Sequence, residues 1–150
     1  MTTPPTIPPL PRDQRQIDAQ HLRLLTIFHY VLAALSLVGL GFLALHWLLM
    51  SSLILNPDAW QNSKSGPPPE QFLALFKWFY VIAGFFIVAS GAATLVSGIM
   101  IRRRRARVFS LIVAGLNCLA FPFGTVLGIF TLLVLLRPSV EELYVATARS

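Results

Sequence analysis

Apolar residues are gathered into three long runs, and polar stretches separate one run from the next. The first run, Leu24 to Met50, is almost continuously apolar, and no charged residue occurs between Arg23 and Asp58. As a helix it would be about 40 Å long, which exceeds the roughly 30 Å hydrocarbon core of a bilayer. The pattern therefore predicts a transmembrane helix over residues 24–50.

A second span is expected over residues 72–101. It follows the polar stretch 56–70, whose proline and glycine content is typical of a loop. Lys77 lies among aromatic residues at the start of this run, and Trp47 lies near the end of the first run. Because tryptophan, tyrosine and lysine are enriched where a membrane meets water, this side of both helices is predicted to lie at an interface.

The third uncharged run, residues 108–136, is interrupted by the sequence Phe-Pro-Phe-Gly around Pro122. One continuous helix would be about 43 Å long and would need roughly 45° of tilt to fit the bilayer core. Proline also removes a helical hydrogen bond and disfavours helical dihedral angles at the residue before it. A hairpin of two spans, 104–120 and 122–137, is therefore the favoured interpretation, with a single crossing as the alternative.

The two ends of the chain differ in character. Residues 1–12 are rich in proline and threonine and lack apolar periodicity, which is typical of a disordered tail. Over residues 139–148, Val140 and Tyr144 fall on one helical face, which predicts a short amphipathic helix at the level of the headgroups. Residues 13–150 are predicted to form a single transmembrane domain, an all-α integral membrane four-helix bundle built of two helical hairpins.

Composition supports a membrane location. The 150 residues are 55% hydrophobic and 12% charged, and the mean hydropathy is +0.69. Soluble proteins average about 25% charged residues, and a chain this short cannot bury so much apolar surface in its own core. The formal charge of +6 would otherwise suggest nucleic acid, but five arginines gather at residues 102–107 between apolar runs, where they act as a topology signal. Nucleic acid is therefore not an expected partner.

Lysine and arginine are distributed unevenly on the two sides of the predicted spans. Arg12, Arg15 and Arg23 precede the first span and the arginine cluster follows the second, whereas Lys64 and Lys77 lie on the opposite side. Basic residues are enriched on the cytoplasmic side of membrane proteins. Both termini are therefore predicted to be cytoplasmic, in a multi-pass membrane protein.

The arginine cluster has two interpretations. Each of its members contributes on the order of 1 kcal/mol near an anionic leaflet, so the cluster is a candidate contact for lipid headgroups such as phosphatidylglycerol or cardiolipin. Alternatively, the cluster only fixes the orientation of the chain, which is the favoured interpretation. Its members are Arg102, Arg103, Arg104, Arg105 and Arg107.

Small residues at four-residue spacing mark surfaces where helices can approach closely. An amide side chain in lipid also stabilises a helix pair by about 1 kcal/mol. Packing within one bundle is favoured, and homo-oligomerisation or docking of a membrane-protein partner is the alternative. The candidate packing residues are Ala89, Ala93 and Ser97 in the second span, Ser110, Ala114 and Asn117 in the third, and Gly124 and Gly128 in the fourth.

Two histidines, His29 and His46, are the ionisable residues inside the first span. An intramembrane histidine is a candidate for haem ligation, proton transfer or hydrogen bonding within the protein. Haem ligation between two helices would need a second histidine, and the later spans contain none, so a structural role is favoured. The single cysteine, Cys118, has no partner for an internal disulfide.

Known catalytic patterns are absent from the sequence. It contains no H-E-x-x-H motif and no glycine-rich phosphate loop, and its 6 acidic residues lie outside the predicted spans. We therefore expect no enzyme activity and no cofactor, and favour a structural or accessory membrane protein that acts through lipid or protein partners. The alternatives are a haem-linked subunit and an oligomeric channel or transporter subunit. The pore-lining candidates are His29, Ser36, Ser90, Thr94 and Thr131.

Two segments resemble a family of small, uncharacterised, multi-pass bacterial membrane proteins. The C-terminal pattern of that family resembles residues 121–144, FPFGTVLGIFTLLVLLRPSVEELY. Its beginning more weakly resembles residues 21–35, HLRLLTIFHYVLAAL. The resemblance implies a location in the bacterial inner membrane. It provides no catalytic residue, because no activity is established for that family.

Overall fold

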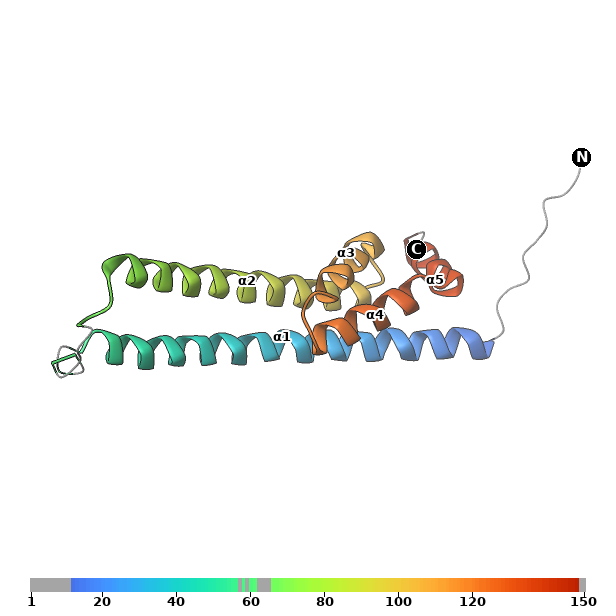
Figure 1. The fold of residues 1–150 in the computed structure, drawn as a ribbon. Coiled ribbons are helices and arrows are strands. Elements are labelled where there is room, and N and C mark those ends of the chain that lie inside the picture. Colours follow the sequence, from blue (N-terminus) through green and yellow to red (C-terminus); the bar gives the residue numbers. More distant parts are fainter. Residues whose placement is uncertain (1–11, 57, 59, 62–65, 149–150) are drawn as a thin grey trace, which may run out of the picture. The chain divides into compact units, whose positions relative to one another are not determined.

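The computed structural model describes residues 12–56, 58, 60–61 and 66–148, and over these residues the chain is all-α. Two long helices come first, α1 (Arg12–Ile54) and α2 (Glu70–Arg102) (Figure 1). Three shorter helices follow, α3 (Arg107–Asn117), α4 (Phe123–Leu135) and α5 (Pro138–Ala148). The predicted disordered tail over residues 1–12 lies outside the described residues, except for its last residue, which already belongs to α1.

The chain divides into two compact units. Unit 1 comprises Met1–Val31 and Thr94–Ser150, and unit 2 comprises Leu32–Ala93. Within the described residues, unit 1 therefore holds the beginning of α1, the end of α2 and the three short helices. Unit 2 holds the rest of the two long helices and the connection between them.

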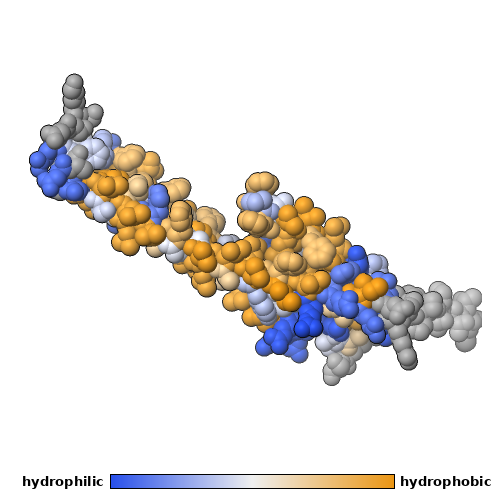
Figure 2. Space-filling model, turned by 90° about the horizontal axis from the view of Figure 1, so that it is seen from below, coloured by the Kyte–Doolittle hydropathy of each residue, from blue (hydrophilic) through white to orange (hydrophobic). Residues whose placement is uncertain are grey.

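Both long helices are long and apolar enough to cross a membrane, as predicted. α1 has 43 residues and α2 has 33, which correspond to about 64 and 50 Å. Large apolar side chains lie on their surfaces, among them Leu37, which is 71% exposed, and Phe85, which is 68% exposed. Apolar side chains cover much of the face drawn in Figure 2. Lipid is the solvent that suits such a surface, because contiguous apolar area is unfavourable in water.

α3 is shorter than the span predicted over residues 104–120. Arg104 and Ala106 adopt left-handed backbone angles, with φ of 50° and 49°, so no continuous helix runs through the loop that precedes it. At its other end, the N–H of Cys118 bonds to the carbonyls of Ala114 and Gly115, which closes the last turn. The 11 residues of α3 correspond to about 16 Å, less than the thickness of the bilayer core.

α4 returns antiparallel to α3 after a turn over residues 118–122, so the predicted hairpin is present (Figure 1). The turn is fixed by Thr125, whose hydroxyl donates to the carbonyl of Cys118 at 2.8 Å. α4 has 13 residues, about 20 Å, and ends before the residue 137 that was predicted. Of the four predicted spans, the two long helices alone reach the length that a crossing requires by themselves.

α5 begins at Pro138, at a bend of 75° from α4. Proline suits the first turn of a helix because its missing N–H would have no helical partner there. Val140 and Tyr144 are buried, which confirms that they share a face, and that face packs on protein. Taken together, α4 and α5 are apolar enough to form a third, broken candidate span.

Glycines on α2 mark where α1 comes close. A Cβ atom on Gly98 would lie 2.9 Å from the Cβ of His29, and both residues belong to unit 1. In unit 2, a Cβ atom on Gly91 would lie 2.8 Å from the Cβ of Ser36. Gly84, Gly91 and Gly98 recur at seven-residue spacing, which returns to the same face of a helix after two turns. Glycine is needed at positions 91 and 98 because a side chain would push the two backbones apart, whereas a Cβ atom on Gly84 would lie at an ordinary contact distance of 3.7 Å from the side chain of Leu43.

Aromatic rings hold the two helices of unit 2 together. The hydroxyl of Tyr80 on α2 forms a hydrogen bond with Nδ1 of His46 on α1. Trp47 stacks on Phe76, with the two ring centroids 5.8 Å apart. These rings lie in the segments for which Trp47 and Lys77 predict a membrane interface, a setting that suits an apolar ring body with a polar edge.

Candidate functional site

Arg107 is tied to the end of the α3–α4 hairpin. Its Nε atom donates to the carbonyl of Leu135 at 2.9 Å, and its guanidinium lies 2.9 Å from a carboxylate oxygen of Glu141 on α5. The carbonyl lies in the last turn of α4, where backbone acceptors lack helical partners and the helix dipole favours a cation. Arg107 therefore joins three helices, α3, α4 and α5, and we call an arginine that links helices in this way a fastener. It does not belong with the lipid contacts predicted for the arginine cluster.

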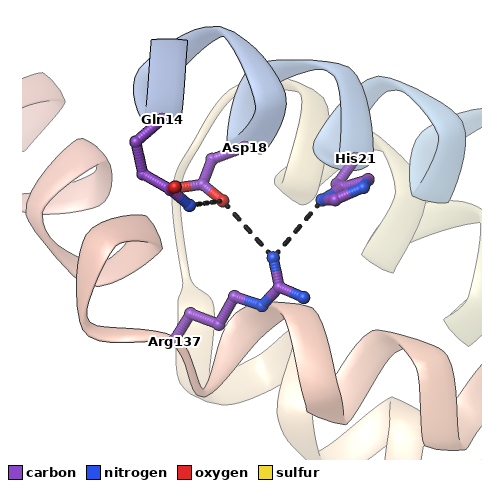
Figure 3. A network of polar contacts seen from close by, with 4 residues as sticks. All are labelled: Gln14, Asp18, His21 and Arg137. Atoms are coloured by element: carbon purple, nitrogen blue, oxygen red, sulfur yellow. Dashed lines mark hydrogen bonds and ion pairs between the residues drawn. The ribbon is translucent and has the colours of Figure 1, made fainter. Parts of the chain in front are cut away.

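Arg137 makes a second fastener, between the α4–α5 bend and α1 (Figure 3). It lies 3.6 Å from the carboxylate of Asp18, which is fully buried, and 3.5 Å from Nδ1 of His21. The amide of Gln14 donates to the same Asp18 oxygen at 3.5 Å. A buried carboxylate needs a cation and hydrogen-bond donors around it, and Arg137 and Gln14 supply them to one oxygen, Oδ1, while Oδ2 is buried without a hydrogen-bond partner.

The other arginines near these fasteners have no such neighbours. Within the described part of the chain, no ion pair or hydrogen bond is formed by the side chains of Arg23, Arg102, Arg103, Arg104 or Arg105. The carboxylates of Asp18 and Glu141, the two acids of unit 1 that form ion pairs, are occupied by Arg137 and Arg107. Two arginines of unit 1, Arg107 and Arg137, are therefore paired with carboxylates, and the five arginines named above are unpaired.

Three of the unpaired arginines line one groove. The groove has a volume of about 460 Å³ and lies between the beginning of α1 and the end of α2, inside unit 1. Arg23, Arg102 and Arg104 provide its positive charge, and Thr26 and Tyr30 provide hydroxyls. Apolar side chains complete the lining: Ala19, Leu22, Ile27 and Ile101. The groove therefore combines an anion-binding rim with an apolar wall.

Two further pockets of unit 1 are lined by arginines. One, of about 770 Å³, is lined by Tyr30, Leu95, Ile99, Arg102 and Arg103. The other, of about 590 Å³, is lined by residues 104–107, in and after the loop between α2 and α3, and by residues of α5 that include Tyr144. Burial raises the pKa of Tyr144 to about 12, although the charges of Arg107 and Arg104 act in the opposite direction. Tyr144 is buried, and its hydroxyl has no hydrogen-bond partner among the described residues.

The predicted packing residues differ in burial, since some lie between helices and others face outward. Thr94 donates to the amide oxygen of Asn117 at 3.2 Å, which joins α2 to α3 as the amide prediction requires. Four-residue spacing in the sequence also marks Gly98, in a stripe with Ser90 and Thr94, but it misses Gly84 and Gly91, because these glycines recur every seven residues. Ser97, Ser110, Ala114, Asn117, Gly124 and Gly128 are buried, Ala93 is half-buried and Ala89 is exposed.

The two histidines have separate surroundings. Nδ1 of His29 is 2.8 Å from the carbonyl of Leu25 one turn earlier, so this nitrogen carries the proton and donates. His46 is half-buried and pairs with Tyr80 in the other unit. Seventeen residues of one helix separate them, about 26 Å, so one chain cannot use both on one haem. Among the described residues, no group of three or more His, Cys, Asp or Glu side chains could hold a metal ion.

The pore-lining candidates do not converge on one surface. Thr94 and Thr131 are buried and bonded within the protein, the latter to the carbonyl of Leu127 at 2.7 Å. Ser36 donates to the carbonyl of Leu32 at 3.0 Å, and Ser90 is exposed and donates to Ile87 at 3.1 Å. The hydroxyls of Thr131, Ser36 and Ser90 donate to carbonyls of their own helices, as is common for serine and threonine in apolar helices, and that of Thr94 donates to Asn117.

No family model, curated protein or solved structure matches this chain. The class that the fold and the basic groove define is a helical protein with two or three candidate membrane spans. Its function has to be argued from these features.

Proposed function

We propose that this chain is a structural or accessory protein of the bacterial inner membrane, held by α1 and α2 and attached to anionic lipid by the arginines of unit 1. The carrying observation is that two span-length apolar helices occur together with a group of unpaired arginines in one unit. An enzyme would need a reactive constellation, and the polar contacts among the described residues instead join helices, as those of Arg107, Arg137 and Thr94 do.

The orientation follows from the arginines. Arg23 lies immediately before the apolar part of α1, and Arg102 ends α2. The positive-inside rule places both on the cytoplasmic side, together with the connection to α3. The loop between α1 and α2 is then outside.

The α3–α4 hairpin is proposed to enter the membrane from the cytoplasmic side and to return without emerging. Helices of about 16 and 20 Å do not reach across a core of roughly 30 Å. The tip is wholly apolar, and Leu119 and Phe121 are 83% and 88% exposed, which suits hydrocarbon rather than water. The N–H groups of residues 118–120 bond back to α3, so little backbone polarity is left for lipid to solvate.

Packing surfaces support the accessory role. The predicted four-helix bundle is proposed in a coarser form, with two full spans and a hairpin that packs through Gly124 and Gly128 in unit 1. Small residues that stay exposed, such as Ala89, leave a surface on α2 for a second copy or for a membrane-protein partner. Contacts of this kind need no catalytic residue.

Alkaline carbonate extraction of bacterial membranes tests the membrane part of this proposal. The wild-type chain is expected to stay in the pellet after extraction at high pH and to dissolve only with detergent, because lipid holds its apolar helices. Release of the chain into the carbonate supernatant would contradict the proposal. Cysteine cross-linking at Ala89→Cys in a Cys118→Ser background then tests for a second copy, with Lys77→Cys as the control at the other end of α2.

A further inference from the structure

The groove of Arg23, Arg102 and Arg104 is more than a positively charged surface, because it combines arginines with hydroxyl groups and an apolar wall. We propose that it binds the phosphodiester headgroup of one anionic membrane lipid. This inference rests on the proposed membrane location and deepens it. It assigns the lipid contact to three particular arginines and to Tyr30, in place of the whole arginine cluster.

Charge is the first argument. The three guanidinium groups line one groove, where like charges repel, and no carboxylate of the described residues pairs with any of them. The fasteners show that carboxylates are available nearby, since Arg107 and Arg137 each have one. Arginine binds phosphate through parallel N–H donors in a fixed geometry, so a phosphodiester would supply the missing negative charge.

Depth in the bilayer is the second argument. Arg23 is the last charged residue before the apolar run of α1, and Arg102 is the first after that of α2. A groove between these two positions lies where phosphate groups of the cytoplasmic leaflet lie. Leu22, Ile27 and Ile101 line the same groove, and they would contact the glycerol and upper acyl chains of a lipid. A free phosphate ion has no apolar part that could contact these side chains.

The backbone at Arg104 is the third argument. This residue adopts a φ of 50°, which places a residue with a Cβ atom in the left-handed region that glycine prefers. Such strain in a non-glycine residue is found disproportionately where a side chain must be held in a functional position. Ala106, with a φ of 49°, has the same backbone strain without a charged side chain. The two positions therefore form a matched pair for experiment.

The test measures thermal unfolding of the purified chain in a non-ionic detergent during titration with phosphatidylglycerol or phosphatidylcholine. Phosphatidylglycerol is expected to raise the Tm saturably, and phosphatidylcholine is expected to have little effect. In Arg23→Gln/Arg104→Gln, half-saturation should need about tenfold more phosphatidylglycerol, because each arginine contributes on the order of a few-fold or more. The control Arg15→Gln/Arg105→Gln removes the same charge outside the groove and should titrate like the wild type.

Glycine substitutions separate binding from folding. Arg104→Gly relieves the left-handed strain, so the lipid-free Tm should rise or stay level while the response to phosphatidylglycerol weakens. Ala106→Gly relieves the same strain and should keep the full response. Equal weakening in both glycine variants, or in both double glutamine variants, would overturn the proposal in favour of diffuse attraction.

Two further results would also overturn the inference. A similar rise of Tm with phosphatidylcholine would mean that the groove does not select an anionic headgroup. Saturation by millimolar inorganic phosphate, with loss of the lipid effect, would mean that the ligand is a free anion. Carbonate extraction keeps this test distinct from that of the proposed function, because a wild-type chain that shows no headgroup selectivity but remains in the membrane pellet contradicts only the inference.

Discussion

Unit 1 and unit 2 are built from the same two long helices, yet they are stabilised differently. Unit 1 has fully buried side chains such as Leu25, Ile101 and Leu135, and two arginine fasteners that join its short helices. In unit 2, most side chains are exposed or half-buried, and the helices meet at glycines and a cluster of rings. Unit 1 therefore has a core of its own, whereas unit 2 leaves large apolar side chains such as Leu37 and Phe85 exposed.

The two units also differ in the number of buried polar side chains that they contain. Buried hydroxyls and an amide, such as Ser97, Ser110 and Asn117, occur in unit 1, where several helices surround them. In unit 2 the interhelical polar contact is the pair His46–Tyr80. A lipid-facing helix pair has few positions at which a polar group can find a partner, so most polar contacts collect where a third and fourth helix are present.

The largest effect is expected from Gly128→Leu in unit 1. A Cβ atom there would lie 2.7 Å from Sγ of Cys118 and would also clash with the carbonyl of Ala114, so the hairpin has to open. We expect a loss of about 3 kcal/mol in the free energy of unfolding, measured by denaturant titration in micelles. Gly115→Leu is the control, because a Cβ atom at Gly115 meets nothing within 4 Å. Equal losses in both variants would mean that the α3–α4 contact is not the cause.

The next effect is expected from Arg107→Gln, which removes both contacts of one fastener. The carbonyl of Leu135 and the carboxylate of Glu141 lose a charged partner, and the expected cost is about 2 kcal/mol. Arg105→Gln should cost almost nothing, because Arg105 is exposed. Hydrogen exchange of the amides in α5 measures the consequence, and unchanged protection there would show that the fastener does not hold α5.

Much of this architecture can be predicted from the sequence, because uncharged run length and a proline break are local signals. The long helices and the hairpin follow from Leu24–Met50, from the second run and from Pro122. The pairing of the arginines cannot be predicted in this way. Arg107 and Arg105 look alike in sequence, and only the folding of α4 and α5 brings Leu135 and Glu141 to one of them. The start of α3 depends on left-handed residues that carry no glycine signal.

A smaller effect is expected from Gly91→Leu in unit 2. A Cβ atom at Gly91 would lie 2.8 Å from the Cβ of Ser36, and the helices can separate in lipid more easily than in a closed core. The expected loss is about 1.5 kcal/mol, measured by the same denaturant titration. Gly41→Leu, on the open side of α1, should leave stability level or raise it slightly because leucine favours helix more than glycine does. A larger loss than that of Gly128→Leu would invert the comparison between the units.

The smallest effect is expected from Tyr80→Phe, which removes one hydrogen bond and keeps the ring. Interhelical hydrogen bonds in membrane proteins average about 0.6 kcal/mol, so a loss of that order is expected. The contact of the ring at position 80 with Trp47 should persist in the variant, because the two tilted rings have centroids 5.0 Å apart. Tryptophan fluorescence checks this point, and a red shift of emission would show that the hydroxyl, not the ring, organises the cluster.

The central proposal is that two full spans place the arginines of unit 1 on the cytoplasmic side and that the α3–α4 hairpin returns to that side without crossing. Single cysteines at Gln61→Cys, Phe121→Cys and Glu142→Cys, each in a Cys118→Ser background, test it with a membrane-impermeant thiol reagent on intact spheroplasts. Labelling is predicted at position 61 in intact cells, at position 142 only after lysis, and at position 121 in neither condition. Labelling of position 121 from outside would mean that the hairpin crosses the membrane, and labelling of position 142 from outside would contradict the orientation itself.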